Sequence, residues 1–418
     1  MKISEYNIVK KIKNKGYLIF NTLFLSLVFI DKKDYKDFIS LNSKNKNFET
    51  WKNQHIITSI VDEYSDAYNS IYASMPRDKQ IITIYTTTAC NARCSYCFEK
   101  GIKPLTIKKE DCKKLSTAII NSNTAKNLHI TWFGGEPLLN TYAINEITKQ
   151  LESHCLNNGI KYTSSIITNA SLVNIEIAKK MRDDWNIKAV QITLDGCEKK
   201  YNKIKNYADG SDFKKVINNI KILTKYIKKP TIRINFDKNN LKNTIKLVKY
   251  LYKENLRSDK IYIYFAPITS NKGNDRSKKE LNKQYKIIFK TLIKYGYLKD
   301  FNYFHFHFAR EHCQAENPIC YCLFPNGNVA KCQREKPSMS QISIYEKDFL
   351  QKLNQSWKDF SKKKNIEECK NCKARPLCAG GCKIHNYQNL TKNHCDVCFM
   401  YKDCFDAILT AMSKIYLK

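Results

Sequence analysis

The sequence predicts an α/β protein in which a partial (β/α)6 barrel of the TIM type lies between a small N-terminal α+β module and a cysteine-rich C-terminal domain. Between residues 81 and 266, short β-rich runs alternate with longer amphipathic segments, and each connection is long enough for a right-handed crossover. Different patterns precede and follow this alternation. We therefore expect three domains, at residues 1–80, 81–300 and 301–418.

The composition is that of a globular protein with an uneven charge. Apolar residues make up 43% of the 418 residues, which is ample for a barrel-sized core. The 72 Lys+Arg residues outnumber the 39 Asp+Glu residues, for a formal net charge of +33. Because the lysines are scattered among Ile and Asn, we interpret most of them as solvated surface. The charge suits an acidic peptide, and a nucleic acid is not the expected partner.

The first 80 residues predict strands followed by helices. Strand-like runs occupy residues 6–30, and charged helical segments follow at 32–42 and 60–75. The apolar stretch at 16–30 is shorter than the roughly 20 residues that span a bilayer and contains polar residues, so we interpret it as buried strands. We recognise no export signal, and seventeen cysteines in so large a chain suit reduced thiolates. The expected location is the cytoplasm, away from the membrane.

Six strands are expected in the barrel. Their residue ranges are 81–87, 128–134, 164–169, 188–196, 231–237 and 261–267. Between them lie helical patterns, such as 108–122 and 145–158, with apolar residues at steps of three and four. In βα barrels the reactive groups lie on loops after the carboxyl ends of the strands, so the functional site is expected there.

Three cysteines directly follow the first expected strand, in the stretch "CNARCSYC". Cys90, Cys94 and Cys97 are spaced by four and three residues. A loop this short can wrap three thiolates around one inorganic cube and leave one iron of a 4Fe–4S cluster without a protein ligand. An open metal position is where a substrate or cofactor binds. The alternative is buried or zinc-binding cysteines, although zinc would want a fourth ligand close by.

The spacing Cys-x3-Cys-x2-Cys, with Tyr96 before the last cysteine, resembles the radical SAM superfamily. The resemblance implies that these cysteines hold a 4Fe–4S cluster whose open iron binds S-adenosylmethionine (SAM). An electron from the cluster then breaks a carbon–sulfur bond of SAM and yields a 5′-deoxyadenosyl radical that abstracts hydrogen from the substrate.

Motifs at the next strand ends agree with this resemblance. "GGEP" (134–137) is similar to the motif that holds the SAM amino group, and its two glycines let backbone approach a ligand closely. "TNA" (168–170) resembles Thr-Asn-Gly, and "LDG" (194–196) resembles the motif near the SAM ribose, although Tyr201-Asn202 replaces its usual downstream His-Asp. No catalytic residue is assigned. The residues implied to contact SAM are Tyr96, Gly134, Gly135, Glu136, Thr168, Asn169 and Asp195.

Cysteines also crowd the C-terminal segment, for example in "CKNCKARPLCAGGC" (369–382). Taken alone, such Cys-x2-Cys pairs suggest a zinc ribbon. The full arrangement resembles a SPASM domain, which implies two auxiliary 4Fe–4S clusters and three clusters in all. The inner cluster would be held by Cys332, Cys382, Cys313 and one of Cys320 or Cys322. The outer cluster would be held by Cys369, Cys372, Cys378 and one of Cys395 or Cys398.

SPASM-bearing enzymes mostly modify peptides or proteins. We therefore expect a radical SAM peptide maturase that forms a thioether or carbon–carbon cross-link in a ribosomally made precursor peptide. The N-terminal module would either dock the leader of that peptide by strand addition or merely pack on the barrel. A low-potential donor such as flavodoxin or ferredoxin would supply electrons.

Two alternatives stay open at this point. One is an anaerobic sulfatase-type maturase that makes formylglycine. Those enzymes carry an Asp directly after the cysteine of Gly-x4-Cys, where this chain has Gln333. The other is a zinc-stabilised nucleic-acid-binding protein that is not an enzyme.

Overall fold

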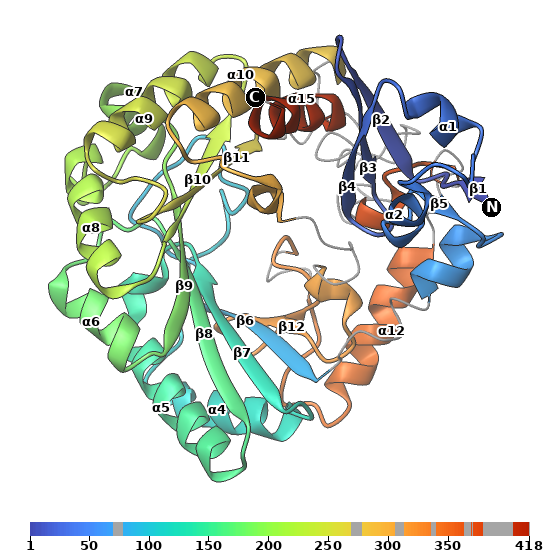
Figure 1. Ribbon diagram of the computed structural model, residues 1–418. Helices are drawn as coiled ribbons and strands as arrows, with labels where there is room; N and C mark the ends of the chain where they lie inside the picture. The colour runs from blue at the N-terminus through green and yellow to red at the C-terminus, as the bar shows by residue number, and fades with distance from the viewer. Residues whose placement is uncertain are drawn as a thin grey trace. The chain divides into compact units, whose positions relative to one another are not determined.

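A computed structural model describes most of the chain in two compact units. The described residues are 1–69, 78–268, 278–305, 313–335, 340–362, 369, 371–378 and 404–417 (Figure 1). One unit contains Met1–Met75, Thr269–Cys313 and Lys362–Lys418, and the other contains Pro76–Ile268 and Gln314–Ser361. The domain boundaries expected at residues 80 and 300 stay predictions.

The second unit is built on an eight-stranded sheet with the order β11-β10-β9-β8-β7-β6-β12-β13. Strands β6 to β11 form a parallel set, each paired with its neighbour in the chain. Their bounds are β6 (Lys79–Thr87), β7 (Asn127–Gly134), β8 (Lys161–Thr168), β9 (Ile187–Thr193), β10 (Thr231–Phe236) and β11 (Tyr262–Pro267). The expected fold class, a partial α/β barrel of six parallel strands, is confirmed.

Two short strands from the C-terminal part of the sequence extend this sheet. Strand β12 (Tyr321–Leu323) pairs parallel with β6, and β13 (Val329–Ala330) pairs antiparallel with β12. The sequence did not suggest this extension, because two- and three-residue strands carry no periodic pattern. It brings the cysteines at 320 and 322 to the edge of the barrel sheet.

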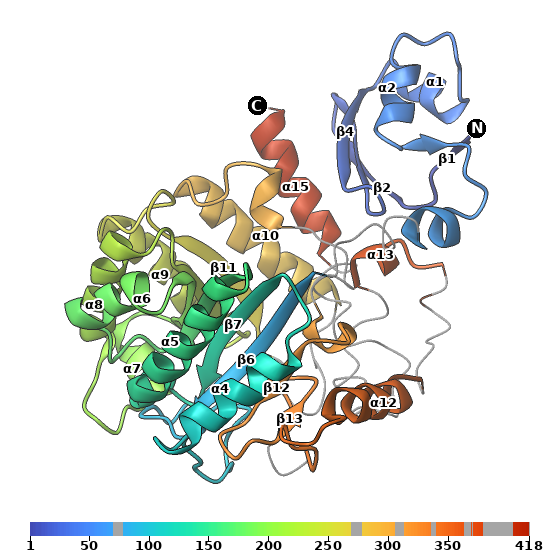
Figure 2. The same cartoon turned by 90° about the horizontal axis from the view of Figure 1, so that it is seen from below.

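Helices cover one face of the barrel sheet (Figures 1 and 2). They are α4 (Asp111–Ser122), the 3₁₀ turn η2 (Pro137–Asn140), α5 (Thr141–Asn157), α6 (Ile175–Asp183), α7 (Glu198–Lys205), α8 (Phe213–Tyr226) and α9 (Leu241–Lys253). Side-chain caps mark where several begin: Asn140, Asn174 and Asp212 each accept a hydrogen bond from a backbone N–H in the first turn. The same unit also holds η4 (Gln314–Glu316) and α12 (Phe349–Lys362).

Alternation along the strands gives the barrel sheet two different faces. On β7, Ile130 and Trp132 are fully buried on the side of the helices, whereas His129 and Thr131 point to the opposite side and are partly exposed. We call this opposite side the inner face. Its partly exposed polar residues are the expected lining of a βα-barrel site.

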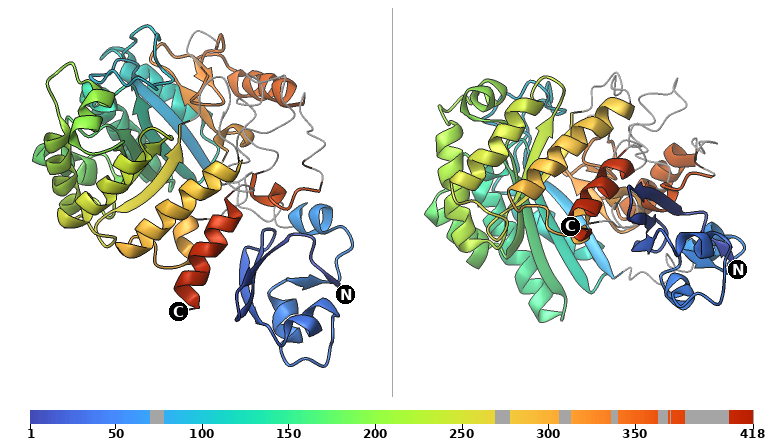
Figure 3. Two further views of the ribbon diagram at one scale, coloured as in Figure 1. Left: turned by 90° about the horizontal axis from the view of Figure 1, so that it is seen from above. Right: turned by 45° about the horizontal axis from the view of Figure 1, so that its top comes forward.

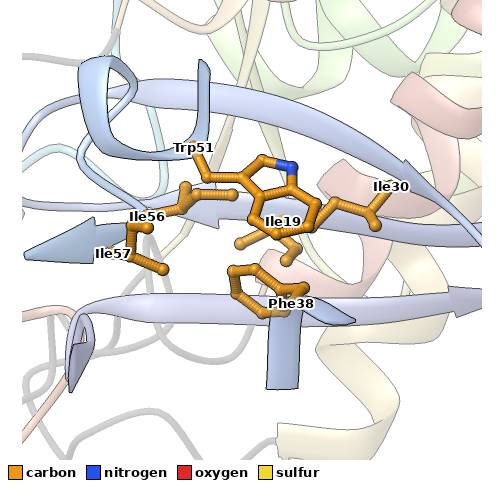
Figure 4. Close-up of a cluster of buried hydrophobic side chains, with 6 residues drawn as sticks. All are labelled: Ile19, Ile30, Phe38, Trp51, Ile56 and Ile57. Carbon is orange, nitrogen blue, oxygen red and sulfur yellow. The ribbon is translucent and has the colours of Figure 1, made fainter. Parts of the chain in front are cut away.

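The first unit contains a small N-terminal sheet with its own core. Strands β2 (Asn7–Ile12), β3 (Gly16–Asn21) and β4 (Ser26–Asp31) are antiparallel in the order β2-β3-β4, and β1 (Lys2–Ile3) pairs with β5 (Ile57–Thr58) (Figure 3). The apolar stretch at 16–30 therefore forms strands, as expected. Six side chains pack into the core shown in Figure 4: Ile19, Ile30, Phe38, Trp51, Ile56 and Ile57.

Helices complete this unit. Those of the N-terminal segment are α1 (Tyr35–Ile39), α2 (Phe48–Asn53) and the π-helix η1 (Glu63–Tyr68), and α2 was not anticipated from the sequence. The later ones are α10 (Lys278–Lys294), η3 (Phe301–Phe304), α13 (Arg375–Cys378) and α15 (Phe405–Tyr416), of which α15 packs on α10 and on β2. Among the helices in the described ranges, none is both long and apolar enough to cross a membrane.

Candidate active site

The loop after β6 holds Cys90, Cys94 and Cys97 together. All three side chains are partly exposed, and Cys94 and Cys97 lie close enough to Cys90 that their ionisation would raise its pKa. A turn in which Cys97 N donates to Cys94 O at 3.2 Å brings the last two together. Burial raises the pKa of Cys90 to about 11 and that of Cys97 above its usual value. Both are therefore thiols at neutral pH unless a bound metal stabilises the thiolate.

Gly134 and Gly135 pack against the backbone that leads into this loop. Gly135 N donates to Thr87 O at 3.0 Å, and Glu136 N donates to Ala89 O at 3.0 Å. A Cβ on Gly135 would lie 2.6 Å from the carbonyl carbon of Ala89, closer than real side chains approach. The close approach that the glycines permit is thus to the cysteine loop itself. A contact of these glycines with SAM stays a prediction.

Glu136 is fully buried and joins the ends of β7 and β8. Its carboxylate accepts hydrogen bonds from Leu138 N (3.1 Å), Thr168 Oγ1 (2.7 Å) and Asn169 N (2.7 Å). Burial raises the pKa of Glu136 to about 7, although these three bonds favour the carboxylate. A carboxylate can accept about four hydrogen bonds, but Glu136 is 0% exposed, so a contact of its side chain with SAM stays a prediction.

Asn169 links Glu136 to the cysteine loop. Its side chain donates to Asn91 Oδ1 at 2.9 Å, and Asn91, which follows Cys90, also donates to Ser171 Oγ at 2.8 Å. Ala170, at the position where the resembling motif has Gly, adopts φ = +62°. This left-handed conformation costs about 1 kcal/mol for a residue with a Cβ, which explains the Gly of the motif. Ala170 is fully buried, and packing of its methyl group offsets that cost.

A second buried network lies after β9, where Asp195 meets Tyr96 of the cysteine loop. The Tyr96 hydroxyl donates to Asp195 Oδ2, and Asn235 N donates to Asp195 Oδ1 at 3.0 Å. Lys205 Nζ lies 3.4 Å from Asp195 Oδ2, and the two side chains are 4% and 0% exposed. Burial lowers the pKa of Lys205, but Tyr96 and Asp195 raise it more, so Lys205 stays protonated.

Lys205 is a site residue that the sequence did not reveal. It is the last residue of α7, and its backbone oxygen accepts a hydrogen bond from Arg93 N at 2.7 Å, inside the cysteine loop. Its charge is also close enough to act on Cys94. No sequence signal marks it, because it is one of many lysines in a Lys-rich stretch.

The structure separates the roles of Cys320 and Cys322. Cys322 on β12 is fully buried in a cluster with Tyr85, Phe133, Phe324 and Ala330. It pairs with Ala330, two residues before Cys332, and the charges of Cys322 and Cys332 interact. The Cys320 Sγ instead accepts a hydrogen bond from Ile81 N of β6 at 3.2 Å. The geometry therefore brings Cys322, rather than Cys320, toward Cys332.

The structure describes only some of the remaining candidate ligands. Cys313 is exposed, Cys369 and Cys372 are partly exposed, and Cys378 is buried. Cys382, Cys395 and Cys398 lie outside the described residues. In the described ranges, no group of three or more His, Cys, Asp or Glu side chains is arranged around a single metal ion. The thiolates that hold a 4Fe–4S cluster lie farther apart than those that hold a single ion. The three thiols on the short loop after β6 suit such a cluster with one open iron.

Comparison with known proteins identifies the barrel. Residues 84–263 match the Radical SAM superfamily. The cysteine-type anaerobic sulfatase-maturating enzyme of Clostridium novyi (strain NT) is 25% identical over 362 residues, which cover 78% of this chain and 94% of that enzyme.

Two solved structures share the fold. Native anSMEcpe with bound AdoMet and Kp18Cys peptide has a TM-score of 0.65 at 20% identity, covering 81% of this chain and 99% of that chain. Streptococcus suis SuiB bound to precursor peptide SuiA has a TM-score of 0.53 at 16% identity, covering 97% of this chain and 99% of that chain. The resemblance read from the cysteine spacing is thus confirmed for the barrel, because residues 84–263 match the Radical SAM superfamily.

Proposed function

We propose that this chain is a radical SAM maturase that abstracts hydrogen from a residue of a ribosomally made precursor peptide and forms a thioether or carbon–carbon cross-link. The match of residues 84–263 to the Radical SAM superfamily supports an enzyme. The observation that carries the proposal is a set of hydrogen bonds that connects the cysteine loop to the ends of three other strands, β7, β8 and β9. Glu136, Asn169 and Asp195 all bond to that loop or to residues bonded to it.

Different side chains around the loop would hold the 4Fe–4S cluster and SAM. Cys90, Cys94 and Cys97 would hold the cluster, which when bound supplies the electron that cleaves SAM. Glu136 would accept a hydrogen bond from the SAM amino group. The Tyr96–Asp195–Lys205 network would orient the loop beside the ribose. Phe98, which stacks on Phe133 with ring centroids 6.5 Å apart, would help to exclude water.

A second part of the proposal concerns the C-terminal cysteines. Cys322 and Cys332, with Cys313 and Cys382, would hold an inner auxiliary 4Fe–4S cluster. Cys369, Cys372 and Cys378, closed by Cys395 or Cys398, would hold an outer one. The position of Cys322 beside Cys332 supports the inner set.

A peptide substrate is supported by the relatives and by the N-terminal sheet. The solved structures named above hold a peptide or a precursor peptide. In the N-terminal sheet, β2 packs against α15, whereas β4 pairs only with β3 among the described strands. A leader peptide would add to the edge of β4 as a further strand. Flavodoxin or ferredoxin would be the electron donor.

A sulfatase-type maturase is a second candidate, favoured by the 25% identity over nearly the whole length of the Clostridium novyi enzyme. Against it stands Gln333, because the enzymes of that group carry an Asp after the equivalent cysteine. Here the backbone oxygen of Gln333 accepts a hydrogen bond from the Tyr85 hydroxyl at 2.6 Å.

Mass spectrometry on peptides separates the two candidates. The reconstituted protein, SAM and dithionite are incubated with a sulfatase-motif cysteine peptide or with short peptides encoded beside the gene for this chain. The proposal expects a loss of two hydrogens with a new cross-link in a neighbouring-gene peptide. Formylglycine in the sulfatase-motif peptide, with no cross-link elsewhere, would establish the second candidate instead.

A further inference from the structure

Arg233 lies on the inner face of the barrel sheet, in the middle of β10. Its strand neighbours Ile232 and Ile234 are fully buried on the helix side, whereas Arg233 is partly exposed. The register pairs it with Thr193 of β9 and Tyr264 of β11. These three strands lie next to one another in Figure 1. The guanidinium therefore lies on the inner face, three residues before the last residue of β10, at whose carboxyl end a barrel enzyme has its site.

Two fixed side chains hold Arg233 in place. Arg233 Nε donates to Asn235 Oδ1 at 2.9 Å, and the guanidinium lies 6.0 Å from the ring centroid of Tyr264. The Tyr264 hydroxyl donates to Gln191 Oε1 at 2.8 Å, which fixes the ring across β10. A guanidinium restrained on two sides keeps its remaining N–H donors in a defined direction.

No carboxylate of the described residues pairs with Arg233. The nearby Asp195 is matched by Lys205, and Arg182 on α6 shows the ordinary arrangement, with two bonds of 2.6 and 2.8 Å to Asp183. The charge of Arg233 on the inner face is therefore not balanced by a carboxylate of the described residues. Because Arg233 is partly exposed, a partner of opposite charge from outside the chain can reach it.

Arg233 is also connected to the cysteine loop. Its partner Asn235 donates through Nδ2 to the Tyr96 hydroxyl at 3.4 Å, and Tyr96 directly precedes Cys97. A group bound to Arg233 would therefore lie two side chains away from the loop. That separation suits the anchoring of a substrate whose reacting atom lies at the open end of the site.

We propose that Arg233 binds a carboxylate of the peptide substrate, either an Asp or Glu side chain or the C-terminal carboxylate, and so selects which residue reaches the radical. This inference rests on the proposed function. A planar guanidinium pairs with a carboxylate through two parallel hydrogen bonds, a geometry that Lys cannot reproduce. Arg233 would thus be a specificity-determining residue on the strand beside the Asp195 network.

Four peptide libraries test this proposal without knowledge of the natural substrate. Labelled 12-residue peptides of random neutral sequence carry a fixed central Glu or Gln, each with a free or an amidated C-terminus. Binding to the SAM-loaded protein is measured by fluorescence anisotropy without reductant, at near-physiological salt. We expect one carboxylate-bearing set to bind about tenfold more tightly than its neutral counterpart. If the Glu libraries bind more tightly than the Gln libraries, the recognised carboxylate is a side chain. If the libraries with a free C-terminus bind more tightly than the amidated ones, it is the C-terminal carboxylate.

Variants separate Arg233 from the general positive charge of the chain. In Arg233→Gln the preference should disappear, and in Arg233→Lys most of it should be lost. Arg257→Gln is the matched control, because Arg257 also lies over a tyrosine, Tyr252 at 4.9 Å, but on the exposed turn after α9. A preference that persists in Arg233→Gln, or that is lost equally in Arg257→Gln, would assign it to surface charge and overturn the proposal. Equal binding of all four libraries by the unmodified protein would also overturn it.

Peptide-free cleavage of SAM gives the second readout. The control Arg257→Gln should cleave SAM at the rate of the unmodified protein, and Arg233→Gln should still cleave SAM. If that cleavage is lost, the carboxylate on Arg233 belongs to SAM, and the proposal is wrong while the proposed function stands. If the unmodified protein itself leaves SAM intact, the proposed function fails.

Discussion

At the scale of single residues, the site depends on buried charges with specific partners. The Asp195–Lys205 pair is almost completely withdrawn from water, and Asp195 accepts further bonds from Tyr96 and Asn235. Such a pair stabilises little compared with apolar packing, but removing one partner leaves the other charge buried alone. The sequence identified Asp195 through its motif. Lys205 and Asn235 became visible only when the fold brought distant segments together.

Lys205→Met should therefore destabilise the second unit. The loss of the only cation that pairs with Asp195 among the described residues should lower the free energy of unfolding by about 3–5 kcal/mol, measured by chemical denaturation. The matched control is Lys180→Met, because the Lys180–Glu176 pair lies on the exposed face of α6, and its loss should leave the free energy of unfolding nearly unchanged. Equal effects of the two substitutions would contradict this account of the network.

At the scale of elements, the cysteine loop takes its shape from the strand ends against which it packs. Two glycines at the end of β7 allow its backbone to contact residues 87–89 directly. On the other side of β6, β12 adds Cys322 to the sheet edge. The glycine contact and the position of Cys322 each lead to a separate prediction about the iron content of a variant.

Gly135→Ala should displace the loop without unfolding the barrel. Its Cβ would meet the backbone of Ala89, which cannot rotate away, so we expect a cost of about 1–3 kcal/mol and a loss of iron from the cluster at Cys90, Cys94 and Cys97. Iron analysis and electron paramagnetic resonance measure the loss. Gly159→Ala is the control, because an added Cβ there meets no atom within 4 Å, so only the backbone strain of its φ of +65° is tested. Full iron content in Gly135→Ala would contradict the steric argument.

Cys322→Ser and Cys320→Ser form a matched pair, two residues apart and both buried. Because Cys322 lies toward Cys332, its replacement should remove about one 4Fe–4S cluster per chain. Cys320→Ser should keep that iron, since Cys320 bonds to the β6 backbone. The measurement is iron per chain after anaerobic reconstitution. Loss of iron in the Cys320 variant alone would reverse the assignment.

At the scale of the whole molecule, the regular parts could be predicted and the long-range contacts could not. The six parallel strands carry apolar runs, and the motifs lie at their carboxyl ends, so the barrel and the position of its site followed from local patterns. The pairing of β12 with β6, the Lys205 contact with the loop and the choice between Cys320 and Cys322 depend on residues up to about 240 positions apart. Local periodicity contains no information about such contacts.

The central claim is that three thiols on one loop hold a cluster that cleaves SAM. The most direct measurement is 5′-deoxyadenosine, quantified after the anaerobically reconstituted protein is mixed with SAM and dithionite. We expect its formation by the unmodified protein and by the control Cys112→Ala, whose cysteine is buried on α4. The variant with Ala at positions 90, 94 and 97 should form none while it keeps its auxiliary iron. Intact SAM in the presence of the fully loaded, reduced protein would contradict the claim.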